Sequence, residues 1–396
     1  MRWRQAGITL VNARVIGEAG RVASTVRVRG DRVDGLDVAP ARDDLVVDLD
    51  GAVVTPGLVN AHDHLELNSF PRLKWRERYD NAGEWIADFQ PRFTRDPCLA
   101  PANPETLEDR LWVGGLKNLL SGVTTVCHHN PLHRSLRRPF PVRVVRNYRI
   151  SHSLLIDGPQ VAESYRRTPS EWPWIIHAAE GVDGAAAREI ELLDQLGCLG
   201  ANTVLVHGVA ICAERGRQLA SRGVSLIWCP TSNAFLFAAC ADVRAFDDAG
   251  RLALGSDSRL SGEGDLLDEV RAAAATHQVS AEGVVRMVTS GAADVLRLTG
   301  AGRLRARAPA DLAVIRPLAN DAYDTIAGAC RTDVTLVMVG GQAALAAPEL
   351  ADVFTHLGVE RTEVMVDGQP RVMARWLARR ARRLRLAEPG LEVAAC

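Results

Sequence analysis

Between residues 55 and 302 the chain alternates short apolar runs with longer stretches rich in Ala, Leu, Arg and Glu. The apolar runs are GVTTV, VRVV, WIIHA, TVLVHG, VSLIWC and RLALG. Strands buried on both faces of a parallel sheet have continuous apolar sequences, and helices connect them. The pattern predicts an α/β fold in which β/α units build a TIM-like (β/α)8-type barrel, regular or distorted. Seven strands are clear, and the fourth is either HSLLID at 152–157 or a degenerate unit.

Shorter strands of another kind flank this region. Residues 7–54 contain ITLVNARVI, STVRVRGDRV and LVVDLDGAVV, and ADLAVI and VTLVMVGGQ follow residue 305. Gly, Asp and Asn punctuate them, as turns require. We expect a small β-sandwich module from both chain ends (1–54 plus 303–370), a barrel over 55–302 and a basic C-terminal helix and tail over 371–396. That helix, with Met373, Trp376, Leu377 and Leu384 on one side, is expected to dock on the body, with membrane-surface binding as the alternative.

The bulk composition suits a large barrel with a smaller module. The chain has 396 residues, of which 47% are hydrophobic, and its 47 Lys and Arg nearly balance its 48 Asp and Glu. Without a basic excess, nothing indicates a nucleic-acid partner. The eight Cys are scattered singly, as in reduced thiols, and neither a signal peptide nor a membrane span is apparent. We therefore expect a cytoplasmic homodimer that acts on a small molecule, away from membranes.

Polar residues close four of the predicted strands. His62 and His64 end VVTPGLVNAHDH, His177 ends WPWIIH, His207 ends NTVLVH and Asp257 ends RLALGSD. All strand carboxyl ends meet at one face of such a barrel, and residues i and i+2 of a strand point to the same side. A buried, hydrogen-bonded His explains any one of these positions but not all of them together. The sequence therefore predicts a site for a divalent metal ion at this face.

The order of several motifs resembles the amidohydrolase superfamily. They are PGLVNAHDH at 56–64, HAAE at 177–180, LVHG at 205–208, CPTSN at 229–233 and LGSDS at 254–258. The resemblance extends from the N-terminal β module to about residue 316. It is greatest to the branch of cytosine, guanine and S-adenosylhomocysteine deaminases and triazine hydrolases, which bind one metal ion.

The resemblance implies a set of roles. His62, His64, His177 and Asp257 would hold one ion, zinc or alternatively iron, and His207 would orient the water. Relatives outside this branch bridge two ions with a carboxylated Lys on strand four, but the only lysines, Lys74 and Lys117, lie elsewhere, which favours a single ion.

The catalytic chemistry rests on Asp257 and Glu180. A bound ion lowers the pKa of its water from 15.7 towards roughly 7, and Asp257 can both touch the ion and take the water's proton. Glu180, three residues after His177, resembles the family acid that protonates a ring nitrogen. The alternative for Glu180 is a simple interaction with a helix dipole.

Weaker candidates are expected to contact substrate. The long segment 65–102 carries aromatics that form a lid or pocket wall, or only pack the loop down. His128 and His129 end strand two and face either the pocket or a buried hydrogen-bond partner. Glu66 reaches substrate or pairs with an Arg, Asn233 orients Asp257 or a loop, and Trp228 contacts substrate or packs the core. The full set of predicted substrate contacts is Glu66, Trp75, Trp85, His128, His129, Trp228 and Asn233.

The predicted function is hydrolysis of carbon–nitrogen bonds, best read as hydrolytic deamination of an aminated nitrogen heterocycle. An amidase that opens a cyclic or acyl amide is the alternative, because the same metal site serves both. A non-catalytic scaffold is disfavoured because every ligand position is filled. The segments after strands two to four are short or unusual, so resemblance to any one relative does not identify the substrate of this chain.

Overall fold

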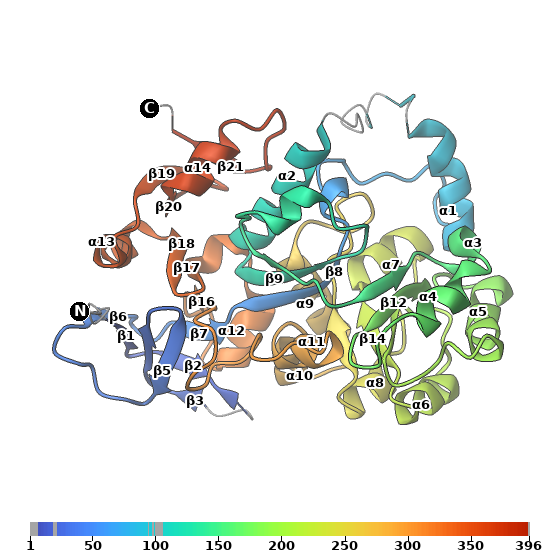
Figure 1. Cartoon of the computed structure of the whole chain (residues 1–396), viewed down its shortest axis with the longest axis horizontal. Coiled ribbons are helices and arrows are strands. Elements are labelled where there is room, and N and C mark those ends of the chain that lie inside the picture. Colours follow the sequence, from blue (N-terminus) through green and yellow to red (C-terminus); the bar gives the residue numbers. More distant parts are fainter. Residues whose placement is uncertain (1–6, 19–21, 94, 97–98, 100–105, 395–396) are drawn as a thin grey trace.

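The computed structural model describes residues 7–18, 22–93, 95–96, 99 and 106–394, which form an α/β fold (Figure 1). Eight strands of these described residues run in chain order through the centre of the molecule. They are β8 (Leu58–Asp63), β9 (Val123–His128), β10 (Arg143–Val144), β11 (Arg149–Ser151), β12 (Trp174–Ala178), β13 (Thr203–His207), β14 (Ser225–Trp228) and β15 (Leu252–Leu254).

Hydrogen bonds divide these strands into two parallel sheets with the orders β10-β9-β8 and β11-β12-β13-β14-β15. A parallel bridge between Asp63 and Asp257 joins the end of β8 to the segment after β15. No ladder joins the described strands β10 and β11. The strands therefore follow the order of a barrel, although hydrogen bonds do not close them into one sheet.

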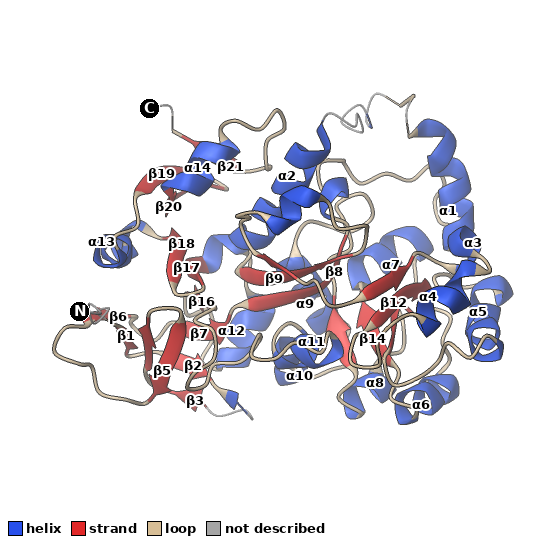
Figure 2. Ribbon diagram, in the orientation of Figure 1, coloured by secondary structure: helices blue, strands red, loops and turns tan. Residues whose placement is uncertain are grey.

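Helices surround the parallel strands (Figure 2). Every residue of β9, β12, β13 and β14 is buried, which explains their continuous apolar sequences. Polar caps start the helices: Asp183 accepts from the backbone of Ala186 at α5, and Asp265 forms a capping box with Asp268 at α9. The helices are α2 (Leu107–Leu120), α4 (Gln160–Arg166), α5 (Gly184–Gln195), α6 (Ala213–Ser221), α7 (Pro230–Phe237), α8 (Arg244–Asp248), α9 (Leu266–Ala275), α10 (Ala281–Met287) and α11 (Ser290–Val295).

The fourth strand does not lie at 152–157, the first of the two positions that the sequence suggested. HSLLID is not a strand, because residues 154–157 form helix α3 (Leu154–Asp157). Ser153 accepts a hydrogen bond from the backbone N–H of Ile156 (3.2 Å), and Gly158 ends the helix at a φ of +49°. The fourth strand is instead β11, with three residues, beside a third strand, β10, with two. This agrees with the degenerate alternative.

Both chain ends contribute strands at one end of the molecule (Figure 1). A four-stranded sheet, in the order β5-β4-β1-β6, contains β1 (Ile8–Val11), β4 (Val26–Arg29), β5 (Arg32–Leu36) and β6 (Leu45–Asp48). A nine-stranded sheet combines the two ends, because β7 (Val53–Pro56) pairs antiparallel with β16 (Leu312–Ile315). Its other strands are β2 (Arg14–Ile16), β3 (Val22–Ala23), β17 (Val334–Val339), β18 (Gln342–Ala346), β19 (Arg361–Val366), β20 (Gln369–Ala374) and β21 (Leu391–Val393). Sandwich packing and the domain boundaries stay predictions.

The C-terminal segment expected to be helical from residue 371 begins as a strand. Residues 371–374 belong to β20, where Val372 pairs with Glu363 of β19, and helix α14 (Arg375–Ala381) is only seven residues long. Trp376 packs edge-on against Trp112 with ring centroids 6.2 Å apart, and Arg380 pairs with Glu108 (2.9 Å). These contacts match a docked helix. Among the described residues, no helix combines the length and hydrophobicity needed to span a bilayer.

Candidate active site and metal centre

Polar side chains gather where the parallel strands end. β8, β12 and β13 carry His62, His177 and His207, and His64, His129 and His152 lie one residue beyond β8, β9 and β11. Asp257 lies three residues after β15 and contacts β8 through the Asp63–Asp257 bridge. All of them except His152 are buried. The predicted convergence of His62, His64, His177, His207 and Asp257 is present in the geometry.

The ring nitrogens of three histidines face one another. Nε2 of His177 lies 3.2 Å from Nε2 of His62 and 3.4 Å from Nε2 of His64. Oδ1 of Asp257 lies 3.9 Å from Nε2 of His62 and 3.8 Å from Nε2 of His64. Two nitrogens bound to one ion at about 2.1 Å in a tetrahedron are themselves about 3.4 Å apart. These separations fit a single small cation.

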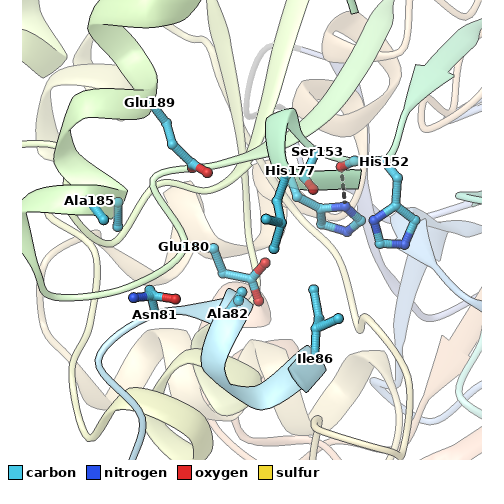
Figure 3. A pocket seen from close by; sticks show the side chains of 12 residues that line it. Asn81, Ala82, Ile86, His152, Ser153, His177, Glu180, Ala185 and Glu189 are labelled. Carbon is cyan, nitrogen blue, oxygen red and sulfur yellow. Dashed lines mark hydrogen bonds between the residues drawn. The ribbon is translucent and has the colours of Figure 1, made fainter. Parts of the chain in front are cut away.

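Hydrogen bonds hold these donors in place. The backbone N–H of His64 donates to the carbonyl of Asp257 (3.1 Å), and that of Asp257 donates to the carbonyl of His62 (3.1 Å). Nδ1–H of His177 donates to the carbonyl of His152 (2.7 Å), a contact drawn in Figure 3. This fixes the tautomer of His177 so that Nε2 carries a free lone pair.

The electrostatics of the cluster also fit a cation. Burial, reinforced by neighbouring imidazoles, lowers the pKa of His62 and of His177 well below the usual range. Burial opposes ionisation of Asp257, but His64, His207 and two serine hydroxyls outweigh it and lower the pKa of this carboxyl. Three neutral imidazoles and one carboxylate form a donor set that zinc accepts while keeping a position open.

Asp257 presents one oxygen to the cluster because the other is engaged. Oδ2 accepts hydrogen bonds from the hydroxyls of Ser232 (2.8 Å) and Ser261 (2.7 Å). The backbones of Asp257 and His207 are left-handed, with φ of +51° and +74°. Such conformations are uncommon for residues other than glycine and cost roughly 1–3 kcal/mol each. Here they occur at strand ends that deliver functional side chains.

Glu180 and His207 form the other side of the site. Nδ1–H of His207 donates to Oδ1 of Asn233 (2.9 Å), which leaves its Nε2 as an acceptor, and Oε1 of Glu180 lies 3.5 Å from that Nε2. Burial raises the pKa of Glu180 to about 7. Asn233 therefore contacts His207, whereas the sequence suggested Asp257 or a loop. The residues that hold Asp257 are Ser232 and Ser261.

The segment after β8 crosses the strand ends as a wall. Backbone N–H groups donate from Leu73 to the carbonyl of Leu260 (3.0 Å) and from Ala82 to the carbonyl of Glu180 (2.9 Å). Helix α1 (Ala82–Phe89), capped by Asn81, follows directly and contributes to the pocket lining. These backbone hydrogen bonds hold the segment against the barrel, where it forms a wall of the pocket. Residues 94, 97–98 and 100–102 of the expected lid lie outside the described residues.

The pocket under this wall has a volume of about 230 Å³. Three residues of the metal-site cluster, His64, His177 and Asp257, line it together with Glu180 and His207. Its apolar lining consists of Leu67, Ala82, Trp85, Ile86, Phe89, Ile156, Leu236 and Leu260. A neighbouring chamber of about 180 Å³ shares His152, His177 and Glu180 with it and extends to Glu189 (Figure 3). Glu180 therefore faces both spaces.

Of the predicted substrate contacts, Trp85 lines the pocket. His129 lies in the histidine cluster. The other five predicted contacts do not line the described pocket: Glu66, Trp75, His128, Trp228 and Asn233. Glu66 accepts from the amide of Asn130 (2.6 Å), Trp75 stacks under the guanidinium of Arg92 (4.8 Å), and Trp228 is fully buried in the core.

His152 is the main pocket residue that the sequence reasoning missed. Its ring lines both spaces, and burial lowers its pKa to about 4, so it is neutral near pH 7. It follows β11 directly, just as the other functional residues follow their strands. Placing the fourth strand at 149–151 in the sequence would have identified it.

Comparisons with known proteins agree with this geometry. The Amidohydrolase family model matches residues 173–344. A 5-methylthioadenosine/S-adenosylhomocysteine deaminase of Halobacterium salinarum is 30% identical over 329 residues, covering 70% of this chain and 75% of that protein.

Two solved structures have a similar fold. A triazine hydrolase variant superposes with a TM-score of 0.72 at 19% identity, covering 89% of this chain and 99% of that one. An adenosine deaminase from Xanthomonas campestris with bound zinc has a TM-score of 0.71 at 20% identity, covering 89% and 97%. The fold common to these proteins is a (β/α)8-type barrel, whose strand order the described strands follow. This chain belongs to the amidohydrolase family, and it is a metal-dependent hydrolase of carbon–nitrogen bonds.

Proposed function

We propose that the protein deaminates an aminated nitrogen heterocycle and that Glu180 is the acid that protonates a ring nitrogen of the substrate. The observation that carries this proposal is a pocket carboxyl whose pKa burial raises to about 7. A general acid works best when its pKa lies near the working pH. The deaminase of Halobacterium salinarum supports the same reaction class.

His62, His64, His177 and Asp257 would hold one divalent ion, with zinc first and iron as the alternative. An ion bound there would lower the pKa of a coordinated water from its value in bulk water towards about 7. Both lysines are engaged elsewhere: Lys117 pairs with Asp63 (3.0 Å), and Lys74 donates to the carbonyl of Phe235 (3.0 Å). This supports a single ion, because no lysine is free to bridge a second one.

The proton transfers divide between Asp257 and Glu180. Asp257 takes a proton from the attacking water, which His207 orients, and Glu180 gives its proton to the ring nitrogen beside the attacked carbon. Asp257 then passes its proton to the exocyclic amine, and the C–N bond breaks to release neutral ammonia. The hydroxyl proton on the attacked carbon returns to Glu180 as the carbonyl forms. Charge does not accumulate on the substrate in the enclosed pocket, where it would be costly.

The wall of the pocket favours an uncharged aminated purine with an apolar substituent. Eight apolar side chains form that wall, and neither Arg nor Lys is among its described lining residues. A substrate carboxylate buried there would lose water without gaining a cationic partner. Of the two compounds in the name of the Halobacterium relative, 5-methylthioadenosine suits this wall better than the zwitterionic S-adenosylhomocysteine.

A coupled ammonia assay tests the reaction and its selectivity together. The panel contains 5-methylthioadenosine, S-adenosylhomocysteine, adenine, and uncharged pyrimidine, pterin and triazine amines. We expect ammonia release from 5-methylthioadenosine with a kcat/KM about 10- to 100-fold above that for S-adenosylhomocysteine, the effect of one unpartnered charged group. Equal kcat/KM for the two would refute the apolar-substituent proposal. A silent panel with cleavage of lactams or N-acyl amino acids would replace deamination by the amidase alternative.

The pKa of Glu180 predicts a pH dependence. Because burial raises this pKa to about 7, the protonated acid persists through neutral pH and is lost as the pH rises above it. We expect kcat/KM to fall about tenfold per pH unit above roughly pH 7, because each further unit removes nine-tenths of the remaining acid. The measurement is a kcat/KM profile from pH 5.5 to 9.5. A flat profile over the upper half of that range would contradict the acid role.

Three finer expectations remain proposals. The two sheets at the chain ends would pack as a sandwich, which their continuous apolar core supports. A cytoplasmic location is supported by the unpaired state of all six cysteines that the structure describes in detail. A homodimer is supported by Leu155 and Val182, which are 63% and 43% exposed and flank residues 80–83 at the pocket.

A further inference from the structure

His129 occupies an unusual position beside the metal site. It follows β9, and its backbone N–H donates to the carbonyl of Asp63, the residue between His62 and His64 (3.0 Å). Its ring reaches across the gap between the two parallel sheets, and Nε2–H donates to the carbonyl of Ser151 at the end of β11 (3.2 Å). His129 therefore connects the end of β8 with the end of β11, on opposite sides of the gap between the two sheets.

One ring nitrogen of His129 has no partner. Because Nε2 carries the proton given to Ser151, Nδ1 is an unprotonated nitrogen with a lone pair. This atom is buried and lacks a hydrogen-bond partner among the described residues, and the side chain is 1% exposed. A buried acceptor without a partner has lost its hydration and gained nothing in return, so some group is expected to satisfy it.

The nearest candidates for that group are the metal-site imidazoles and whatever they bind. Ring nitrogens of His62, His129 and His177 lie within 4.8 Å of one another. The ring centroid of His129 lies 4.3 Å from that of His177 and 4.8 Å from that of His62. These separations are no larger than the 4.9 Å between the centroids of His62 and His177 themselves. His129 is packed as closely as the other histidines of the cluster.

We propose that Nδ1 of His129 is a fifth protein ligand of the divalent ion, in addition to His62, His64, His177 and Asp257. Binding the ion satisfies the free lone pair while Ser151 retains the proton on Nε2, an arrangement that fixes both tautomer and ring orientation. The proposal rests on the metal site proposed above, but not on the reaction.

Neighbouring histidines differ from His129 in a way that makes them controls. Nδ1 of His128 already accepts from the backbone N–H of Leu65 (3.3 Å), and its Nε2 faces Glu66 (3.6 Å). Nδ1 of His152 is also buried without a partner, but His152 belongs to neither group of described side chains whose donor atoms converge within 4.8 Å, although its ring centroid lies 4.8 Å from that of His177. His152 is therefore a nearby imidazole that should not bind the ion.

The number of bound imidazoles can be counted in protein loaded with Co²⁺. Each histidine bound through one nitrogen carries one exchangeable N–H on the other, and paramagnetic Co²⁺ moves its proton resonance far from the protein envelope. We expect four such resonances in H₂O, all lost in D₂O. His129→Phe should show three with Co²⁺ still bound by elemental analysis, and His152→Gln should show four. His129→Asn serves as a second variant in case the larger ring disturbs folding.

The outcomes separate the ligand proposal from the function. Three resonances in the unaltered protein, or four that persist in the His129 variants, would overturn the fifth ligand while leaving the metal site and the deaminase proposal intact. Failure of the unaltered protein to bind Co²⁺ would overturn the ligand and the metal site together. A silent ammonia assay with four resonances would contradict only the proposed reaction.

Discussion

Replacing Glu180 with Gln is expected to lower kcat/KM by about 10²–10⁴ while the bound ion remains, the usual effect of losing a general acid. Gln retains the size and polarity of Glu but cannot give a proton to a ring nitrogen. Glu180 is not one of the converging metal donors, and its carboxyl lies instead 3.5 Å from Nε2 of His207. The measurement is steady-state kinetics on the substrate found in the ammonia panel, with elemental analysis of the same preparation.

Glu189→Gln is the matched control for this variant. Burial also raises the pKa of Glu189 to about 7, but its carboxylate accepts from the backbone N–H of Ala179 (2.7 Å) and lines only the neighbouring chamber. Figure 3 shows the carboxyls of Glu180 and Glu189 in the lining of this chamber. We expect the Glu189 variant to retain most of the activity. Near-normal turnover of Glu180→Gln, or equal losses in the two variants, would reduce Glu180 to a structural role.

Lys117→Met is expected to lower the free energy of unfolding by about 3–5 kcal/mol, the typical cost of removing one partner from a buried ion pair. Nζ of Lys117 lies 3.0 Å from Oδ2 of Asp63, and both side chains are fully buried. The ammonium also donates to Asn68 (2.7 Å) and Ser256 (2.9 Å). Met fills the space but leaves the carboxylate of Asp63 without a cation. Chemical denaturation of the metal-loaded protein measures the change.

The double variant Asp63→Asn, Lys117→Met isolates the charge effect. Asn118 donates to Oδ2 of Asp63 (2.7 Å) and Asn68 donates to Oδ1 (2.8 Å), so an amide at residue 63 keeps an oxygen acceptor for Asn118 but loses the bond from Asn68, whose donor then faces an NH2 group. We expect the double variant to be more stable than Lys117→Met alone, as a double-mutant cycle of a coupled pair requires. A double variant that loses the sum of both single changes would show that Lys117 acts through packing and not through its charge.

The parallel strands could be predicted from sequence wherever helices cover them. Runs such as WIIHA and TVLVHG are largely apolar up to the His near their end because both faces of β12 and β13 are buried. The strand β10 lies within the predicted run VRVV, but β11 was not predicted, because its three residues give no periodicity. The segment from residue 371 was predicted as a helix for another reason. The strand β20 and the helix α14 are adjacent and both contain Arg, so the helical pattern of α14 was extended over the end of β20.

The metal donors could be predicted because each closes an apolar strand, a signal that is local in sequence. Their supporting contacts are not local. Asn233 and Ser232 reach His207 and Asp257 from the helix after β14, so only the folded chain shows these contacts. Aromatic residues were weak predictors of substrate contact, because Trp228 and Trp85 look alike in sequence while one lies in the core and the other in the pocket wall.

The antiparallel pairing of β7 with β16 has a consequence for the order of events during synthesis. Val54 of β7 finds Val15 of β2 early, but its other neighbour, Val314 of β16, leaves the ribosome only after the whole barrel has been made. At about 5–20 residues per second, one edge of β7 stays without a partner for many seconds. An unpaired strand edge is a template for association with other chains. Nascent chains of this protein should therefore depend on chaperones until β16 emerges, whereas the sheet of β1, β4, β5 and β6 can form from the first 48 residues alone.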